Sequence, residues 1–126
     1  LKESVTGTDW HAVSKSRTID VKTADKIITE RRIDASDIDV VRMDVEGYEA
    51  EVFRGMENIM NNTSPLLLQI EVHPHLMGQA DTEYLIDELD EHGFNIIFSA
   101  KNGEEQEISS VSELSQFRWI EIIAVR

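Results

Sequence analysis

The sequence predicts an α/β protein with an open, mostly parallel, Rossmann-like sheet and a final antiparallel strand pair. Helical and strand-like segments follow one another in the order helix, strand, helix, strand, helix, strand, strand. Such alternation is typical of right-handed strand–helix–strand crossovers. The first strand-like segments are near-continuous apolar runs, which indicates burial on both faces. The last two strands have no helix between them, so we expect them to pair antiparallel.

The first helix is expected at residues 23–32, with Thr23 as its N-cap because a threonine hydroxyl can accept a free N–H of the first turn. Asp25 then suits the positive end of the helix dipole. The first strand, Ile38–Asp44, is the β-branched run IDVVRMD. A second helix is expected over residues 48–62, ending before Pro65. Its apolar stripe consists of Val52, Met56, Ile59 and Met60.

The second half of the chain continues the alternation. The third helix is expected over residues 81–93, with Asp81 as N-cap and Gly93 as the residue that stops it. Its buried stripe contains Leu85, Ile86 and Leu89. The remaining elements are strands at Leu66–Val72, Phe94–Ala100 and 117–126, with a tight turn at Asn102-Gly103.

A length of 126 residues fits one domain, of which residues 1–17 are polar and expected to be irregular. The chain begins with Leu1 rather than Met, so we expect that sequence upstream of it has been removed. There is no cysteine and no signal peptide, which favours a cytoplasmic location. The absence of eighteen consecutive apolar residues argues against a membrane span.

The charge of the chain excludes one class of partner. With 25 acidic and 12 basic residues the net charge is −13. Nucleic-acid binding normally needs a basic face that displaces counterions from phosphates. The sequence therefore predicts that the protein does not bind nucleic acid directly.

Candidate functional residues follow two of the predicted strands. Asp44 ends one strand and Glu46 follows it, whereas Glu71 ends the next strand and His73 and His75 come directly after it. Ligands of open α/β sheets bind at the carboxyl ends of strands, so neighbouring strands would bring these side chains to one rim. Gly47 would let the backbone turn sharply there.

Each of these residues can also have a purely structural role. Asp44 can cap the next helix, Glu46 can complement its dipole, and the two histidines can belong to a solvated turn. If the rim is functional, two chemistries fit it. One is general base catalysis, and the other is binding of a divalent metal: Mg²⁺ or Ca²⁺ by carboxylates alone, Mn²⁺, Fe²⁺ or Zn²⁺ if a histidine joins them.

These motifs resemble the FkbM family of methyltransferases over about residues 18–100. The strongest match is the Asp-Val-Glu-Gly-x-Glu run at Asp44–Glu49, which lies between a strand and a helix as in the family. A Glu-x-His match follows at Glu71–His73. Weaker matches are Thr23-Ala24-Asp25, where the family often has Leu in the middle, Arg42, where it usually has Lys, and Val52 with Arg54-Gly55.

The resemblance implies a class I fold that uses S-adenosylmethionine to methylate an oxygen, often on a sugar or another small molecule. It implies that Asp44 lies near the methyl-donor end of the cofactor, and that Glu46, Glu71 and His73 face the acceptor as candidate catalytic residues. Whether one of them is a base or a divalent metal is held there stays open.

One feature departs from the family. The six glycines are far apart, so the sequence lacks the glycine-rich loop that binds the cofactor. We therefore expect the chain to be the C-terminal part of a methyltransferase domain and to be inactive alone. Two alternatives are a metal- or ligand-binding module and an assembly half-domain. In the latter, a homo-oligomer forms through an exposed sheet edge at Ile38–Asp44.

Overall fold

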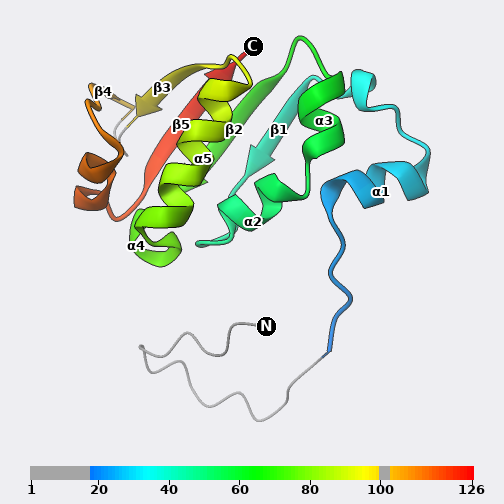
Figure 1. Cartoon of the computed structure of the whole chain (residues 1–126), viewed down its shortest axis with the longest axis horizontal. Helices are drawn as coiled ribbons and strands as arrows, with labels where there is room; N and C mark the ends of the chain where they lie inside the picture. The colour runs from blue at the N-terminus through cyan, green and yellow to red at the C-terminus, as the bar shows by residue number, and fades with distance from the viewer. Residues whose placement is uncertain (1–17, 100–102) are drawn as a thin grey trace.

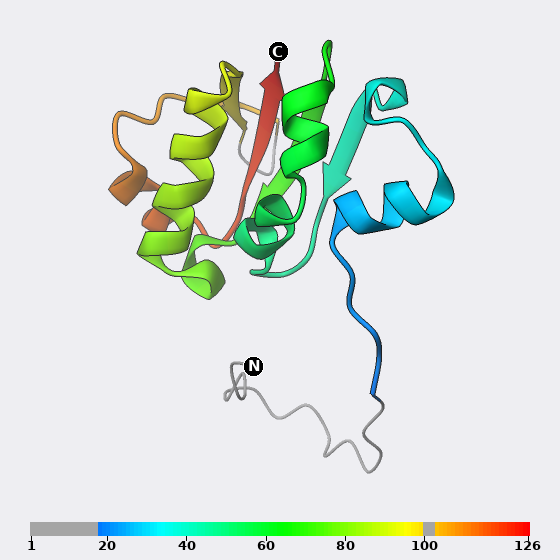
Figure 2. The same cartoon turned by 45° about the vertical axis from the view of Figure 1, so that its right-hand side comes forward.

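The computed structural model describes residues 18–99 and 103–126, and it confirms the α/β class. In this part of the chain three helices cover one face of a five-stranded sheet in both views (Figures 1 and 2). These helices are α2 (Glu49–Arg54), α3 (Glu57–Asn62) and α5 (Gln79–Glu91). The strands are β1 (Val40–Met43), β2 (Leu67–Val72), β3 (Asn95–Ser99), β4 (Glu105–Gln106) and β5 (Ile120–Val125).

The order of the strands is β1-β2-β5-β3-β4, and the sheet is mixed. Only β1 and β2 pair in parallel among the described strands, because β5 lies between β2 and β3 and is antiparallel to both. The expected antiparallel pairing of the last two long strands is confirmed. The expectation of a mostly parallel sheet is wrong, because most of the described strand pairs are antiparallel. The strands β1, β2 and β3 run in one direction, but β5 separates β2 from β3 and pairs antiparallel with both.

The predicted burial of the first strand on both faces is also wrong. β1 stands at the edge of the described sheet, and Val40 is 58 % exposed. Val41 is half-buried and Arg42 is exposed. An apolar run indicates what a strand can bury rather than what covers it, and among the described strands β1 has a neighbour, β2, on one side alone.

The predicted helix over residues 48–62 is two helices, α2 and α3, which meet at Gly55 and Met56. The preceding helix, α1 (Ala24–Arg31), approaches this junction, and Asp25 N–H donates to the Gly55 carbonyl at 3.0 Å. A Cβ at position 55 would lie 2.9 Å from the Thr23 Cβ, so only glycine fits there. The Asp25 carboxylate accepts N–H groups of Asn58 and Ile59, which caps α3 from outside.

Three helix ends test the capping predictions. The Thr23 hydroxyl accepts the Lys26 N–H, so the predicted N-cap of α1 is confirmed. The predicted N-cap at Asp81 is wrong, because α5 begins at Gln79 and Asp81 instead binds Arg54 at 2.8 Å. Gly93 follows the helix at φ +75°, as predicted for its stop.

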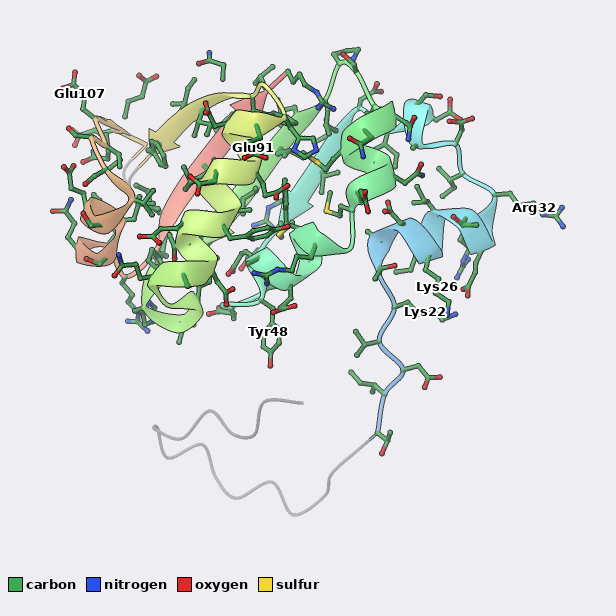
Figure 3. All side chains as sticks on the ribbon, viewed as in Figure 1. Lys22, Lys26, Arg32, Tyr48, Glu91 and Glu107 are labelled. Atoms are coloured by element: carbon green, nitrogen blue, oxygen red, sulfur yellow. The ribbon has the colours of Figure 1, made fainter. Side chains whose placement is uncertain are left out.

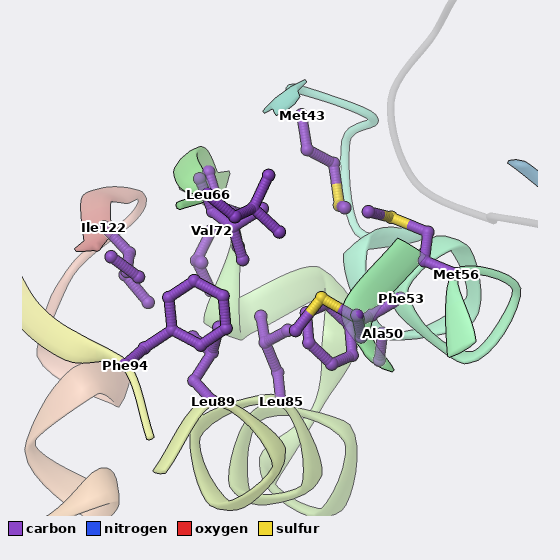
Figure 4. Packing of buried hydrophobic residues seen from close by; sticks show 14 of the residues in the cluster. Met43, Ala50, Phe53, Met56, Leu66, Val72, Leu85, Leu89, Phe94 and Ile122 are labelled. Atoms are coloured by element: carbon purple, nitrogen blue, oxygen red, sulfur yellow. The ribbon is translucent and has the colours of Figure 1, made fainter. Parts of the chain in front are cut away.

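The core lies between the sheet and the helices (Figure 4). Phe94 and Ile122 face Leu85 and Leu89 of α5, while Met56 packs near Met43 of β1. These side chains are all at most 6 % exposed. Ile86 and Val52, which were expected in the apolar stripes, are half-buried at the edge of the core.

Several short elements were not predicted. They are η1 (Ala35–Asp37), α4 (Pro74–Met77), β4 and η2 (Val111–Gln116). Residues 1–17, Ala100 and Asn102, to which the expected irregular segment, strand end and tight turn refer, lie outside the described residues. Within the described ranges, no helix combines the length and the apolar character that crossing a membrane requires.

Candidate functional site

The carboxyl ends of β1 and β2 lie side by side, as the sequence predicts. Their parallel register ends with the pair Met43 and Ile70, so Asp44 and Glu71 both follow the last pair at the same edge of the sheet (Figure 1). His73 comes directly after β2 and precedes α4. The turn that contains Glu46 connects β1 to α2. The fold thus brings two segments nearly thirty residues apart to one place.

His73 is the centre of a cluster of carboxylates. His73 is buried, with 4 % of its surface exposed. The Nε2 atom lies 3.5 Å from an oxygen of Glu46 and 3.5 Å from an oxygen of Glu71. Both distances exceed those of good hydrogen bonds. The Glu46 side chain is 76 % exposed, so it can move aside and open Nε2 to an acceptor molecule.

Glu49 is the residue of this cluster that sequence reasoning missed. A glutamate in the first turn of a helix ordinarily does no more than complement the helix dipole. In the structure the side chain of Glu49 is fully buried and its Oε1 atom lies 3.1 Å from Nδ1 of His73. The same oxygen accepts the N–H of Gly47 at 3.0 Å. The signal that could have identified Glu49 was its place as the last member of the Asp-Val-Glu-Gly-x-Glu run.

The turn at Glu46-Gly47 positions the exposed carboxylate. Glu46 has φ +51° and Gly47 has φ +98°, so both residues occupy the left-handed region. Gly47 also touches α4, since a Cβ there would lie 2.6 Å from the Cβ of Leu76. Glycine alone tolerates this combination of conformation and contact. The turn is therefore packed against the segment that carries His73.

Asp44 and His75 lie apart from the core of the cluster. Asp44 binds Arg42 at 3.3 Å, and a third of its side chain (32 %) is exposed. It caps no helix, because the N-cap of α2 is Tyr48, so the capping interpretation is wrong. His75 is exposed in α4, with its ring centroid 6.3 Å from that of His73.

The cluster does not fit a metal ion. Among the described residues, no group of three His, Asp or Glu side chains is placed to hold one. The contacts of Glu46 and Glu71 within this cluster are with Nε2 of His73.

A groove of about 390 Å³ lies between α2, α3 and α5. Arg54 lies on its wall, 4.2 Å from the ring centroid of Tyr84. The hydrogen bond to Asp81 raises the pKa of Arg54, and burial raises the pKa of Tyr84. None of the residues around His73 lines this groove. Its walls consist of helix surfaces rather than strand ends, so we do not place the chemistry there.

In open α/β sheets, ligands bind at the carboxyl ends of the strands, and the histidine–carboxylate cluster lies at such ends. The comparisons give the family. The model of the methyltransferase FkbM domain matches residues 3–96, and the chain belongs to this family. The protein is therefore a member of a methyltransferase class. Neither curated proteins nor solved structures gave a match.

Proposed function

We propose that the protein is an S-adenosylmethionine-dependent O-methyltransferase in which this chain provides the acceptor side of the active site. The observation that carries the proposal is the orientation of His73. Its Nδ1 atom faces the buried Glu49, and its Nε2 atom faces the exposed Glu46. An imidazole that a buried carboxylate holds at one nitrogen, and whose other nitrogen faces an exposed side chain free to move aside, is suited to general base catalysis.

The chemistry needs a base if the acceptor is a hydroxyl of high pKa. The cofactor, if bound, would supply a methyl group whose bond to the sulfonium sulfur breaks as the acceptor oxygen displaces it, and it would leave as S-adenosylhomocysteine. Nε2 of His73 would take the proton of the acceptor O–H. The carboxylates of Glu46 and Glu71, each 3.5 Å from Nε2, then stabilise the imidazolium. In-line displacement also requires tight positioning of the acceptor oxygen.

The residues present fit only part of a cofactor site. Asp44 stands at the end of β1 with its carboxylate accessible, and we propose that it contacts the cofactor. The glycine-rich loop that would hold the rest of the cofactor is not in this sequence. We therefore propose that residues 1–126 are the C-terminal portion of one methyltransferase domain, inactive alone.

The surroundings of His73 favour a neutral acceptor with several hydroxyl groups, such as a sugar. Carboxylates at the rim can accept hydrogen bonds from neighbouring hydroxyls and repel anionic acceptors. Tyr48 is 59 % exposed and Leu76 is 45 % exposed, and they belong to the two segments that meet at Gly47. Tyr48 projects from the molecule (Figure 3). These apolar groups can contact the flat face of a sugar ring.

The test measures transfer of labelled methyl groups from S-adenosylmethionine to a panel of sugars and other hydroxylated compounds. The enzyme is the protein produced from its complete gene. We expect His73→Gln to lower kcat by about 10²- to 10⁴-fold, the usual contribution of a positioned base. His75→Gln is the matched control, because His75 is an exposed neighbour in α4.

Unchanged turnover in the His73→Gln variant would show that His73 is not the general base. Transfer to carboxylates or amines, with none to hydroxyls, would remove the assignment of O-methylation. Equal losses in both histidine variants would assign the effect to α4 as a whole.

A second proposal concerns assembly. Val40 is exposed on β1, which is the edge of the described sheet beside α1 (Figure 1). Unpaired strand edges invite pairing with another chain. We propose that the isolated chain forms homo-oligomers through this edge.

A further inference from the structure

We infer that Glu49 is the positioning residue of this site: it holds His73 in the tautomer that leaves Nε2 free to accept a proton. The inference rests on the proposed function for its purpose, but the hydrogen-bond geometry carries it independently. Glu49 begins α2, whereas His73 follows β2, so the contact connects the two segments of the site.

The hydrogen bonds determine which ring nitrogen carries the proton. The backbone N–H of Gly47 donates to Oε1 of Glu49 at 3.0 Å, so this oxygen acts as an acceptor. The same oxygen lies 3.1 Å from Nδ1 of His73. A hydrogen bond between them then requires a proton on Nδ1. In a neutral imidazole with Nδ1–H, the other nitrogen, Nε2, is the acceptor.

A structural role does not explain why a carboxylate occupies this position. Glu49 is 0 % exposed, and its Oε2 atom has no hydrogen-bond partner among the described residues. An unpaired buried polar atom costs free energy, more so if it is charged. An amide could supply the one acceptor that Gly47 and His73 share. What a carboxylate can add, and an amide cannot, is a negative charge beside the imidazole.

The dipole of α2 also fails to explain Glu49. Glu51 lies in the same first turn, and its side chain is 60 % exposed, so it can complement the dipole without the cost of burial. The orienting contact of a carboxylate with a histidine Nδ1 is instead the arrangement by which serine hydrolases hold their catalytic base.

The experiment reads the tautomer by nitrogen NMR of ¹⁵N-histidine-labelled chain, residues 1–126. At a pH where the His73 ring is neutral, we expect the proton on Nδ1. Glu49→Met removes the acceptor with little change in volume and should move the proton of His73 to Nε2 or give a mixture. Glu49→Gln keeps an acceptor oxygen and should retain Nδ1–H. His75 and His92 serve as internal controls in the same spectra.

Two results would overturn the inference. One is a proton on Nε2 in the neutral ring of the unsubstituted chain. The other is an unchanged Nδ1–H in Glu49→Met that retains the backbone spectrum of a folded protein. Because the spectra need neither cofactor nor acceptor, they do not depend on methyl transfer. A correct tautomer in a protein without transferase activity would refute the proposed function and leave the positioning contact intact.

Discussion

Gly47 links the two segments that form the site, so its substitution is a sensitive residue-level test. An alanine there adds strain at φ +98° and a Cβ 2.6 Å from the Leu76 Cβ. We expect Gly47→Ala to lower the free energy of unfolding by about 2–4 kcal/mol, measured by urea denaturation.

Gly93→Ala is the matched control for backbone strain. Gly93 has φ +75°, but nothing lies within 4 Å of the Cβ that alanine would add. We expect Gly93→Ala to lower the free energy of unfolding by no more than about 1–2 kcal/mol. If both substitutions cost the same, the contact with Leu76 has no energetic role.

At the scale of residues, sequence reasoning succeeded where topology alone determines proximity. Glu46, Glu71 and His73 come together because the carboxyl ends of neighbouring parallel strands must meet. Glu49 was missed because a glutamate in the first turn of a helix is ordinarily exposed, and burial depends on what packs over it. The ion pair of Asp44 with Arg42 likewise depends on side-chain placement.

At the scale of elements, Asp25 connects α1 to α3. Its carboxylate accepts the N–H groups of Asn58 at 2.7 Å and Ile59 at 3.2 Å, which are otherwise unpaired at the start of α3. We expect Asp25→Ala to destabilise the protein by about 1–2 kcal/mol, as for the loss of an N-cap, measured by thermal or urea denaturation.

The control for this prediction is Asp20→Ala, which removes an exposed aspartate of the same segment. Its effect should stay within about 0.5 kcal/mol. A loss in Asp25→Ala no greater than in the control would show that α3 does not need this cap.

The same contact explains why helix prediction failed between residues 48 and 62. The apolar stripe continues through Met56 and Ile59, so periodicity alone predicts one helix. The break depends on α1, which approaches Gly55 from a distant part of the chain. The start of α5 was missed for a related reason: a glycine at φ +83°, Gly78, serves as its N-cap, whereas Asp81 is engaged by Arg54.

At the scale of the whole molecule, β1 leaves one edge of the described sheet unpaired. The basic residues Lys22, Lys26 and Arg32 lie on this side around α1, whereas Glu107 lies on the opposite side near β4 (Figure 3). We expect sedimentation velocity to reveal concentration-dependent dimers of the isolated chain.

Val40→Lys should restore the monomer, because a lysine on an edge strand disfavours pairing. Val125→Lys is the control, since Val125 is 44 % exposed but lies on β5, between β2 and β3. A monomer at all concentrations in the unsubstituted chain would rule out this assembly.

The alternation of helices and strands predicted the fold class but not the strand order. The position of β5 depends on which strand edges remain open after β1, β2 and β3 have formed, and the sequence carries no local signal for it. The exposure of β1 depends in the same way on what lies beside it.

The central claim is that His73, oriented by Glu49, is the base of the acceptor site. The most direct test compares methyl-transfer rates of His73→Gln, Glu49→Met and the double variant in the protein from its complete gene. Residues that act as one unit have strongly non-additive effects. The account predicts that the double variant is no slower than His73→Gln. Penalties that multiply in the double variant would contradict it, because the two residues would then act independently.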